Sequence, residues 1–244
     1  MPNFHIHCSL IVATGLLLSS AQSATALEMT EIGQIQIGDR EGFAEMIKYH
    51  SESESLMVTA SETGTIERIS MSNPAMMSMM PPLDLNGGDV TAVAVHNNLV
   101  AASIKAKAAD APGMVKLFDV AGSLLARFQT GALPDNVAFS PDGRYLLTAN
   151  EGEPSDDYTV DPEGSFTLID LAGGATNAKV TQISLDGIEA PAGSRIVKPG
   201  SSFAADAEPE YVAFAPDGKT AYVTLQENNA VAVIDIDTAQ VAKV

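Results

Sequence analysis

The chain has 244 residues, of which 31 are Asp or Glu and only 13 are Lys or Arg, so its formal net charge is −18 at pH 7. A balance this acidic, with no basic cluster, repels nucleic acid and anionic lipid and excludes both as partners, whereas it suits cation binding. After residue 26 no apolar segment is long enough to span a bilayer, so we expect no transmembrane segment.

The first 26 residues are predicted to be a secretory signal peptide. An apolar stretch at residues 10–18 is followed by small polar residues and the tripeptide Ala24-Thr25-Ala26, which is typical of a cleavage site. The stretch departs from the usual pattern in one respect, because no Lys or Arg precedes it. Cleavage removes Cys8, the only cysteine, so the mature chain has no disulfide. We therefore expect a secreted, periplasmic or cell-surface protein.

The rest of the chain repeats one pattern. "PDNVAFSPDGRYLLTANE" from residue 134 and "PEYVAFAPDGKTAYVTLQE" from residue 209 each place alternating apolar residues on both sides of Pro-Asp-Gly, which predicts an antiparallel hairpin. A third apolar run follows each hairpin, and weaker copies lie upstream. Short strands that recur about every 45 residues indicate an all-β fold, a β-propeller, rather than a sandwich. The expected copies span residues 44–80, 88–125, 132–172 and 207–244.

Four copies are predicted to form about four blades of a larger propeller. The last copy, ending in "AQVAKV", is expected to stop after its third strand, without a fourth strand to close a ring. The Met-rich segment at residues 71–82 is expected to serve as packing or as a flexible linker between the first two copies, and soft-metal binding by its thioethers is the alternative. The remaining blades of the same propeller are therefore expected partners.

The copies carry a family resemblance. The block from residue 131 to 171 and the repeat after residue 208 resemble the choice-of-anchor I family, which includes mesenchyme-specific cell-surface glycoprotein-like members. The resemblance covers essentially everything after about residue 40. It implies a seven-bladed propeller of the YVTN type, exported, with an anchor at the far C-terminus. Some relatives are called alkaline phosphatase-like.

One connection concentrates negative charge. Residues 150–164 replace a short turn of the last copy and contain six carboxylates without Lys or Arg. Insertions in repeat folds commonly map to the binding face, and carboxylates are the ligands that calcium prefers. Their spacing does not match an EF-hand, and a solvated negative loop is the alternative interpretation. Converging strand starts would add three carboxylates. The candidate calcium ligands are therefore Glu151, Glu153, Asp156, Asp157, Asp161, Glu163, Asp135, Glu208 and Glu210.

The leading functional prediction is a non-enzymatic binding or surface-interaction module for an unknown protein or surface ligand, with calcium as the candidate ion. The alternative is a metal-dependent phosphoesterase whose site is completed by further blades. Such an enzyme needs clustered metal ligands and cations that hold the phosphate. The mature chain offers His50 and His96, both predicted at the surface, and Arg195 and Lys198 as nearby cations. We expect no catalytic residues and no organic cofactor.

Overall fold

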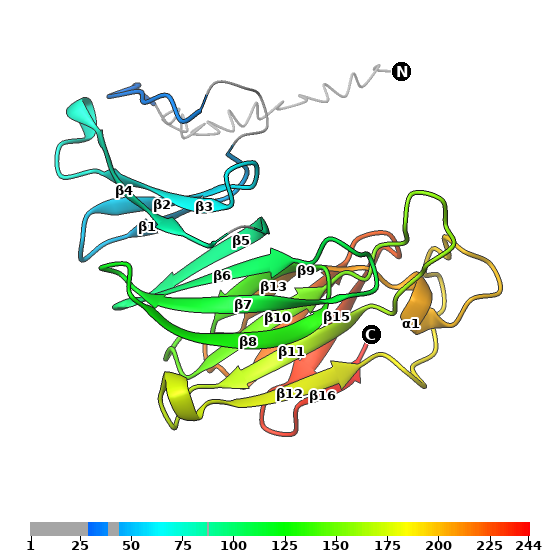
Figure 1. Ribbon diagram of the computed structural model, residues 1–244. Coiled ribbons are helices and arrows are strands. Elements are labelled where there is room, and N and C mark those ends of the chain that lie inside the picture. The colour runs from blue at the N-terminus through cyan, green and yellow to red at the C-terminus, as the bar shows by residue number, and fades with distance from the viewer. Residues whose placement is uncertain (1–28, 39–43, 87) are drawn as a thin grey trace, which may run out of the picture. The chain divides into compact units, whose positions relative to one another are not determined.

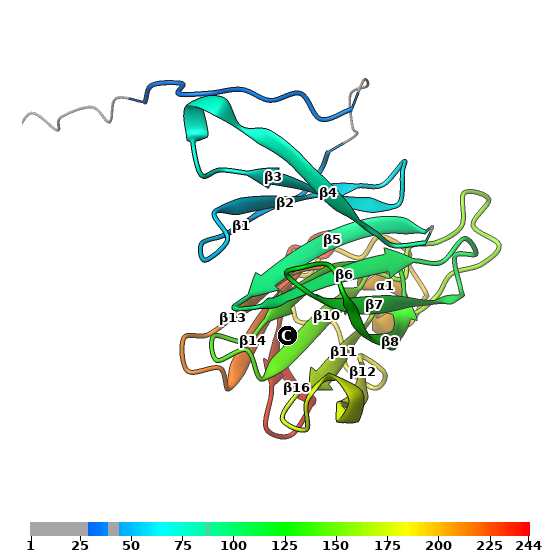
Figure 2. The same cartoon turned by 60° about the vertical axis from the view of Figure 1, so that its left-hand side comes forward.

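The computed structural model describes residues 29–38, 44–86 and 88–244, and the predicted signal peptide at residues 1–26 lies outside them. The chain divides into two compact units, Met1–Glu31 and Ile32–Val244, and all described strands belong to the second. These strands form four antiparallel sheets of four strands each (Figures 1 and 2). We call the sheets the first to the fourth blade. The predicted β-propeller architecture is confirmed.

Each blade is a simple meander, in which consecutive strands pair as antiparallel neighbours. The first blade contains β1 (Ile47–His50), β2 (Ser55–Ala60), β3 (Thr65–Ser70) and β4 (Ser78–Asp84). The second contains β5 (Asp89–His96), β6 (Leu99–Lys105), β7 (Pro112–Asp119) and β8 (Leu124–Ala132). The third contains β9 (Pro134–Phe139), β10 (Tyr145–Asn150), β11 (Ser165–Asp170) and β12 (Lys179–Ser184). The fourth contains β13 (Pro209–Phe214), β14 (Thr220–Leu225), β15 (Ala230–Asp235) and β16 (Gln240–Lys243).

Three short helical turns lie between strands. They are η1 (Pro74–Met76), η2 (Ala175–Asn177) and α1 (Phe203–Asp206), and the last precedes the fourth blade. No helix in the described ranges is long and apolar enough to cross a membrane.

The Pro-Asp-Gly turns form the first hairpins of the third and fourth blades as predicted. Gly143 and Gly218 have φ angles of 72° and 69°, in the left-handed region that glycine tolerates. The preceding Asp142 accepts a hydrogen bond from the Arg144 backbone N–H at 3.0 Å, and Asp217 accepts one from Lys219 at the same distance. Local turn chemistry therefore sets the register of both hairpins.

The prediction that the last copy lacks a fourth strand is wrong. Residues of "AQVAKV" form β16, which pairs with β15, and the Met-rich segment likewise supplies β4 of the first blade rather than a linker alone. A fourth strand pairs on one side only, and β4, β12 and β16 are largely exposed. Such an edge strand has little need for alternating apolar residues, so its pattern is weak in the sequence.

The core lies between neighbouring blades, because each sheet buries its faces against the next. Leu146 and Leu147 are adjacent in β10 and both fully buried, since they point to opposite faces of the third blade. Leu146 packs in the cluster shared with the second blade, and Leu147 in the cluster shared with the fourth. This explains the continuous apolar run "YLLTA", which is typical of a sheet covered on both faces.

The first strands of the blades lie next to one another in chain order, since β5 contacts β1 and β9, and β9 contacts β13. Equivalent positions of the four first strands can be identified from their pairing with the second strands. A hydrophobic residue of each first strand pairs with the fourth residue of the second strand: Ile47, Val93, Val137 and Val212. These strands hold equivalent positions close together, and the starts of three of them contribute to the site described next.

Candidate functional site

The acidic connection at residues 150–164 leaves the third blade between β10 and β11 without disturbing their pairing, because Asn150 still pairs with Ser165. Glycines anchor its two ends. A Cβ on Gly152, whose φ is 69°, would lie 2.8 Å from the Glu163 carbonyl, and one on Gly164 would lie 2.1 Å from the Ala207 carbonyl oxygen. The Gly164 N–H also donates to the Ala204 carbonyl at 2.8 Å. The connection is therefore fixed against the segment that leads into the fourth blade.

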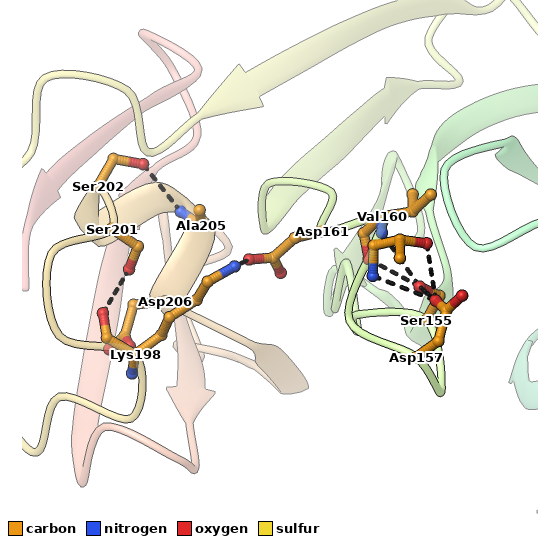
Figure 3. A network of polar contacts seen from close by, with 10 residues as sticks. Ser155, Asp157, Val160, Asp161, Lys198, Ser201, Ser202, Ala205 and Asp206 are labelled. Atoms are coloured by element: carbon orange, nitrogen blue, oxygen red, sulfur yellow. Dashed lines mark hydrogen bonds and ion pairs between the residues drawn. The ribbon is translucent and has the colours of Figure 1, made fainter.

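Asp157 and Asp161 hold this connection in shape. Asp157 accepts hydrogen bonds from the Ser155 hydroxyl at 2.8 Å and the Thr159 hydroxyl at 2.7 Å. The Thr159 hydroxyl, followed by that of Ser155, lowers the pKa of the Asp157 carboxyl. Asp161 forms an ion pair with Lys198, which Figure 3 shows bridging two connections. Both carboxylates therefore have protein partners of their own.

The second of these connections spans residues 185–208, between the third and fourth blades. Its fold depends on Asp206, which is 4% exposed. One Asp206 carboxylate oxygen accepts from the Lys198 backbone N–H at 2.6 Å, and the other accepts from the Asn228 side-chain amide at 2.7 Å. The position of Lys198 is thus set by a buried contact to the fourth blade.

We expect Lys198→Met to loosen the acidic connection without unfolding the protein. The ion pair is half-exposed at Lys198, and pairs of this kind contribute about 0.2–1 kcal/mol. Hydrogen exchange of the amides of residues 155–161 should accelerate several-fold, whereas the unfolding midpoint should barely change. Arg144→Met, which removes the exposed pair with Asp170 on the same blade, is the control. Equal exchange in both variants would contradict a bracing role for Lys198.

Five of the predicted carboxylates come together. We call them the acidic rim: Asp135, Glu151, Glu153, Glu208 and Glu210. Burial, followed by the charges of other rim members, raises the pKa of Glu151 from 4.5 to about 8. Burial and then the charge of Glu227 raise the pKa of Glu208 to about 7. These carboxylates lie within electrostatic reach of one another, so their like charges add to the effect of burial in disfavouring ionisation.

The pKa of Asp135 and of Glu210 is also raised, mainly by burial and then by neighbouring carboxylates. For Asp135 the carboxylate with the largest effect is Glu45, a residue that sequence reasoning missed. Glu45, Asp135 and Glu210 each lie two residues before the matched hydrophobic position of a first strand, and Thr91 takes this place in the second blade. Strict alignment of the four copies would have revealed Glu45.

Two adjoining hollows lie along the acidic rim. One, of about 350 Å³, is lined by Glu45, Asp135 and Glu151 among others. The other, of about 410 Å³, is lined by Lys107, Pro154 and Asp156, and both share Asp89, Lys105 and Glu153. The hollows therefore continue from the first three blades onto the acidic connection. Such a groove can accommodate a ligand that carries positive charge.

Not all candidate ligands converge. Asp156 lines only the outer hollow, Glu163 is exposed, and Asp157 and Asp161 are engaged as described. Within the described ranges, no three His, Cys, Asp or Glu side chains are grouped closely enough to hold a metal ion.

The predicted surface position of His50 is wrong. It is 4% exposed, and its Nε2 contacts the Asn97 carbonyl of the second blade while Nδ1 accepts from the Ser53 N–H at 3.2 Å. Its neighbours in the fold, not its polar sequence context, bury it.

Repeated four-stranded blades packed face to face define this protein as a β-propeller. The choice-of-anchor I domain model matches residues 45–244, and the chain belongs to this family. A search of curated proteins finds no match.

Solved structures confirm the fold. The chain is similar to Kuenenia stuttgartiensis hydrazine synthase (17% identity, TM-score 0.58), covering 78% of this chain and 52% of that one. It is also similar to the Myceliophteria thermophila Cps50 (Swd1) β-propeller domain (11%, TM-score 0.57) and to a functionally unknown Desulfotomaculum acetoxidans protein (11%, TM-score 0.56). The last two alignments each cover 85% of this chain and 56% of the other. The chain thus spans about half the length of these structures.

Proposed function

We propose that this chain is part of an exported, non-enzymatic β-propeller that acts as a binding or surface-interaction module through its acidic rim, with calcium as the stabilising ion. The carboxylates that the first strands and the acidic connection bring within electrostatic reach of one another carry the proposal. Because no three of them are grouped closely enough among the described residues to hold an ion alone, carbonyl and water oxygens would complete the coordination. Burial raises the pKa of Glu151, and the repulsion between these groups when they are ionised together raises it further. A bound cation offsets the repulsion, and calcium takes carboxylate, carbonyl and water oxygens in flexible geometry.

A calcium titration tests the ion. We expect millimolar calcium to raise the unfolding temperature at pH 7.5 relative to chelator, because an ion that binds only the folded state adds about 2.7 kcal/mol at a hundredfold excess over Kd. In a domain of this size that amounts to several degrees. Circular dichroism melts of the chain from residue 27 onward provide the measurement.

Paired variants make the titration specific to the rim. Glu151→Gln with Glu153→Gln should abolish the calcium shift. Glu52→Gln with Glu54→Gln, which neutralises two exposed carboxylates in the β1–β2 turn, should leave it intact. The ion assignment fails if calcium produces no shift, or if both pairs of substitutions reduce the shift equally.

Exposed apolar side chains on the fourth blade indicate that further blades of the same propeller are its partner. Tyr222 and Val231 are 47% and 44% exposed on its outer face. Tyr222 is the third residue of β14, and the third residue of β10, Leu147, is fully buried by the next blade. The apolar side chain at this position of the third blade is thus covered by the fourth blade. We infer that another blade covers the equivalent face of the fourth blade in the complete propeller.

The phosphoesterase alternative finds no support. Both cations considered for a phosphate are already paired with carboxylates, Arg195 with Glu227 at 3.2 Å and Lys198 with Asp161. His50 is buried between two blades and bonded to the backbone. Neither the paired cations nor this histidine offers a free group to a phosphate ester.

A further inference from the structure

A third hollow has chemistry opposite to that of the acidic rim. It measures about 330 Å³ and is lined by residues of all four first strands, β1, β5, β9 and β13. No Asp or Glu lines it, although the chain has 31 of them. Its charged or titratable lining groups are Lys48, His96 and Tyr211.

The hollow exists because small side chains recur at one register position. Ala94 and Ala138 each pair with the third residue of their second strand, and so does Lys48 of the first blade. Alanine leaves space where a larger residue would fill the surface. Phe139 and Phe214 add aromatic lining, and the His96 ring lies 5.6 Å from that of Phe139. The volume and aromatic lining suit a single planar ring.

Asn136 contributes a side-chain amide to the lining of this hollow. Its side chain is 2% exposed, and its Oδ1 accepts from the Val212 backbone N–H at 3.2 Å. A backbone N–H can only donate, so this contact fixes the amide orientation and leaves the Nδ2 group for another partner. Across the described part of the chain, no acceptor is bonded to Nδ2, and Asn136 lines the hollow. The Nδ2 group is therefore available to donate to a ligand in the hollow.

Lys48 supplies positive charge beside it. Its Nζ donates to the Tyr211 hydroxyl at 3.2 Å and lies 5.8 Å from the centre of that ring. Among the residues that the structure describes, no carboxylate forms an ion pair with Lys48. In a chain with a net charge of −18, Lys48 thus gives this hollow, which Asn136 also lines, a positive charge that no carboxylate of the described residues neutralises by an ion pair.

We propose that this hollow binds a small aromatic carboxylate, with the ring against Phe139 and Phe214 and the carboxylate accepting hydrogen bonds from Lys48 and Asn136. The site is separate from the acidic rim and does not depend on calcium. Charge-assisted hydrogen bonds favour the carboxylate over a neutral ligand of the same shape.

Fluorine NMR of 4-fluorobenzoate with the intact protein tests the proposal. The probe should show saturable line broadening, and neutral 4-fluorobenzyl alcohol should bind at least tenfold more weakly. Lys48→Met keeps the aliphatic stem and removes the charge. Asn136→Asp keeps the oxygen that accepts from Val212 but replaces the N–H donors with an anion. Each substitution should weaken probe binding about tenfold or more, the effect of losing one hydrogen bond to a charged group.

Lys179→Met, which removes an exposed ammonium from the outer strand β12, should leave binding unchanged. An amide spectrum of each variant verifies folding. If Asn136→Asp is unfolded, the binding result for Lys48→Met alone decides the proposal. The proposal is overturned if the probe does not saturate, if the alcohol binds as well as the acid, or if binding survives Lys48→Met.

Discussion

Phe166→Ala is expected to lower the free energy of unfolding by about 3–5 kcal/mol, the usual cost of removing a buried aromatic ring. Phe166 is fully buried in β11 and belongs to the cluster between the third and fourth blades, with Leu147 and Val223. Its loss opens a cavity at the joint on which the fourth blade depends. Urea unfolding followed by circular dichroism measures the effect.

Tyr222→Ala is the matched control, because it also truncates an aromatic ring but on the exposed face of the fourth blade, where Tyr222 is 47% exposed. Its cost should stay near 1 kcal/mol or below. Similar losses for the two variants would contradict the assignment of these faces. A Phe166→Ala protein that unfolds in two separate transitions would show that the fourth blade detaches before the others.

Glu151→Gln is expected to stabilise the protein at pH 8 in the presence of chelator. The pKa of Glu151 rises from 4.5 to about 8 on folding, first through burial and then through Asp135 and Glu153. The folded state therefore binds more protons than the unfolded state between these pH values, so stability falls as pH rises through the window. Glutamine cannot ionise, and it should remove this contribution. Since Glu151 is partly exposed, we expect a gain of about 1–2 kcal/mol at pH 8 after solvent screening.

The pH profile distinguishes this effect from a general change in charge. At pH 4 the variant and the parent should have equal stability, because Glu151 is then protonated in both states. Glu52→Gln, at an exposed turn, should show no such divergence. A variant that is less stable than the parent at pH 8 would show that the Glu151 charge is compensated in the folded state. With calcium present, that reversed sign is the result that the proposed ion site requires.

Local patterns in the amino-acid sequence determined much of this protein. Alternating apolar residues around Pro141-Asp142-Gly143 and its copy specify hairpins, because strand and turn preferences are local. Repetition of the pattern indicates a propeller, since a single such sheet cannot bury its own faces. The same strand starts placed Asp135 and Glu210 near the acidic connection. Those expectations needed no knowledge of contacts between blades.

Tertiary structure decided the rest, because it depends on neighbours far apart in the chain. The edge strand β16 forms by pairing with β15, although its own residues are mostly exposed. His50 is buried by the turn of the second blade, and Lys198 forms an ion pair with Asp161. Charge composition alone could not divide the acidic residues into those that brace a loop and those that converge. That division follows from packing, which brings Asp135 close enough to raise the pKa of Glu151 and leaves Glu163 exposed to solvent.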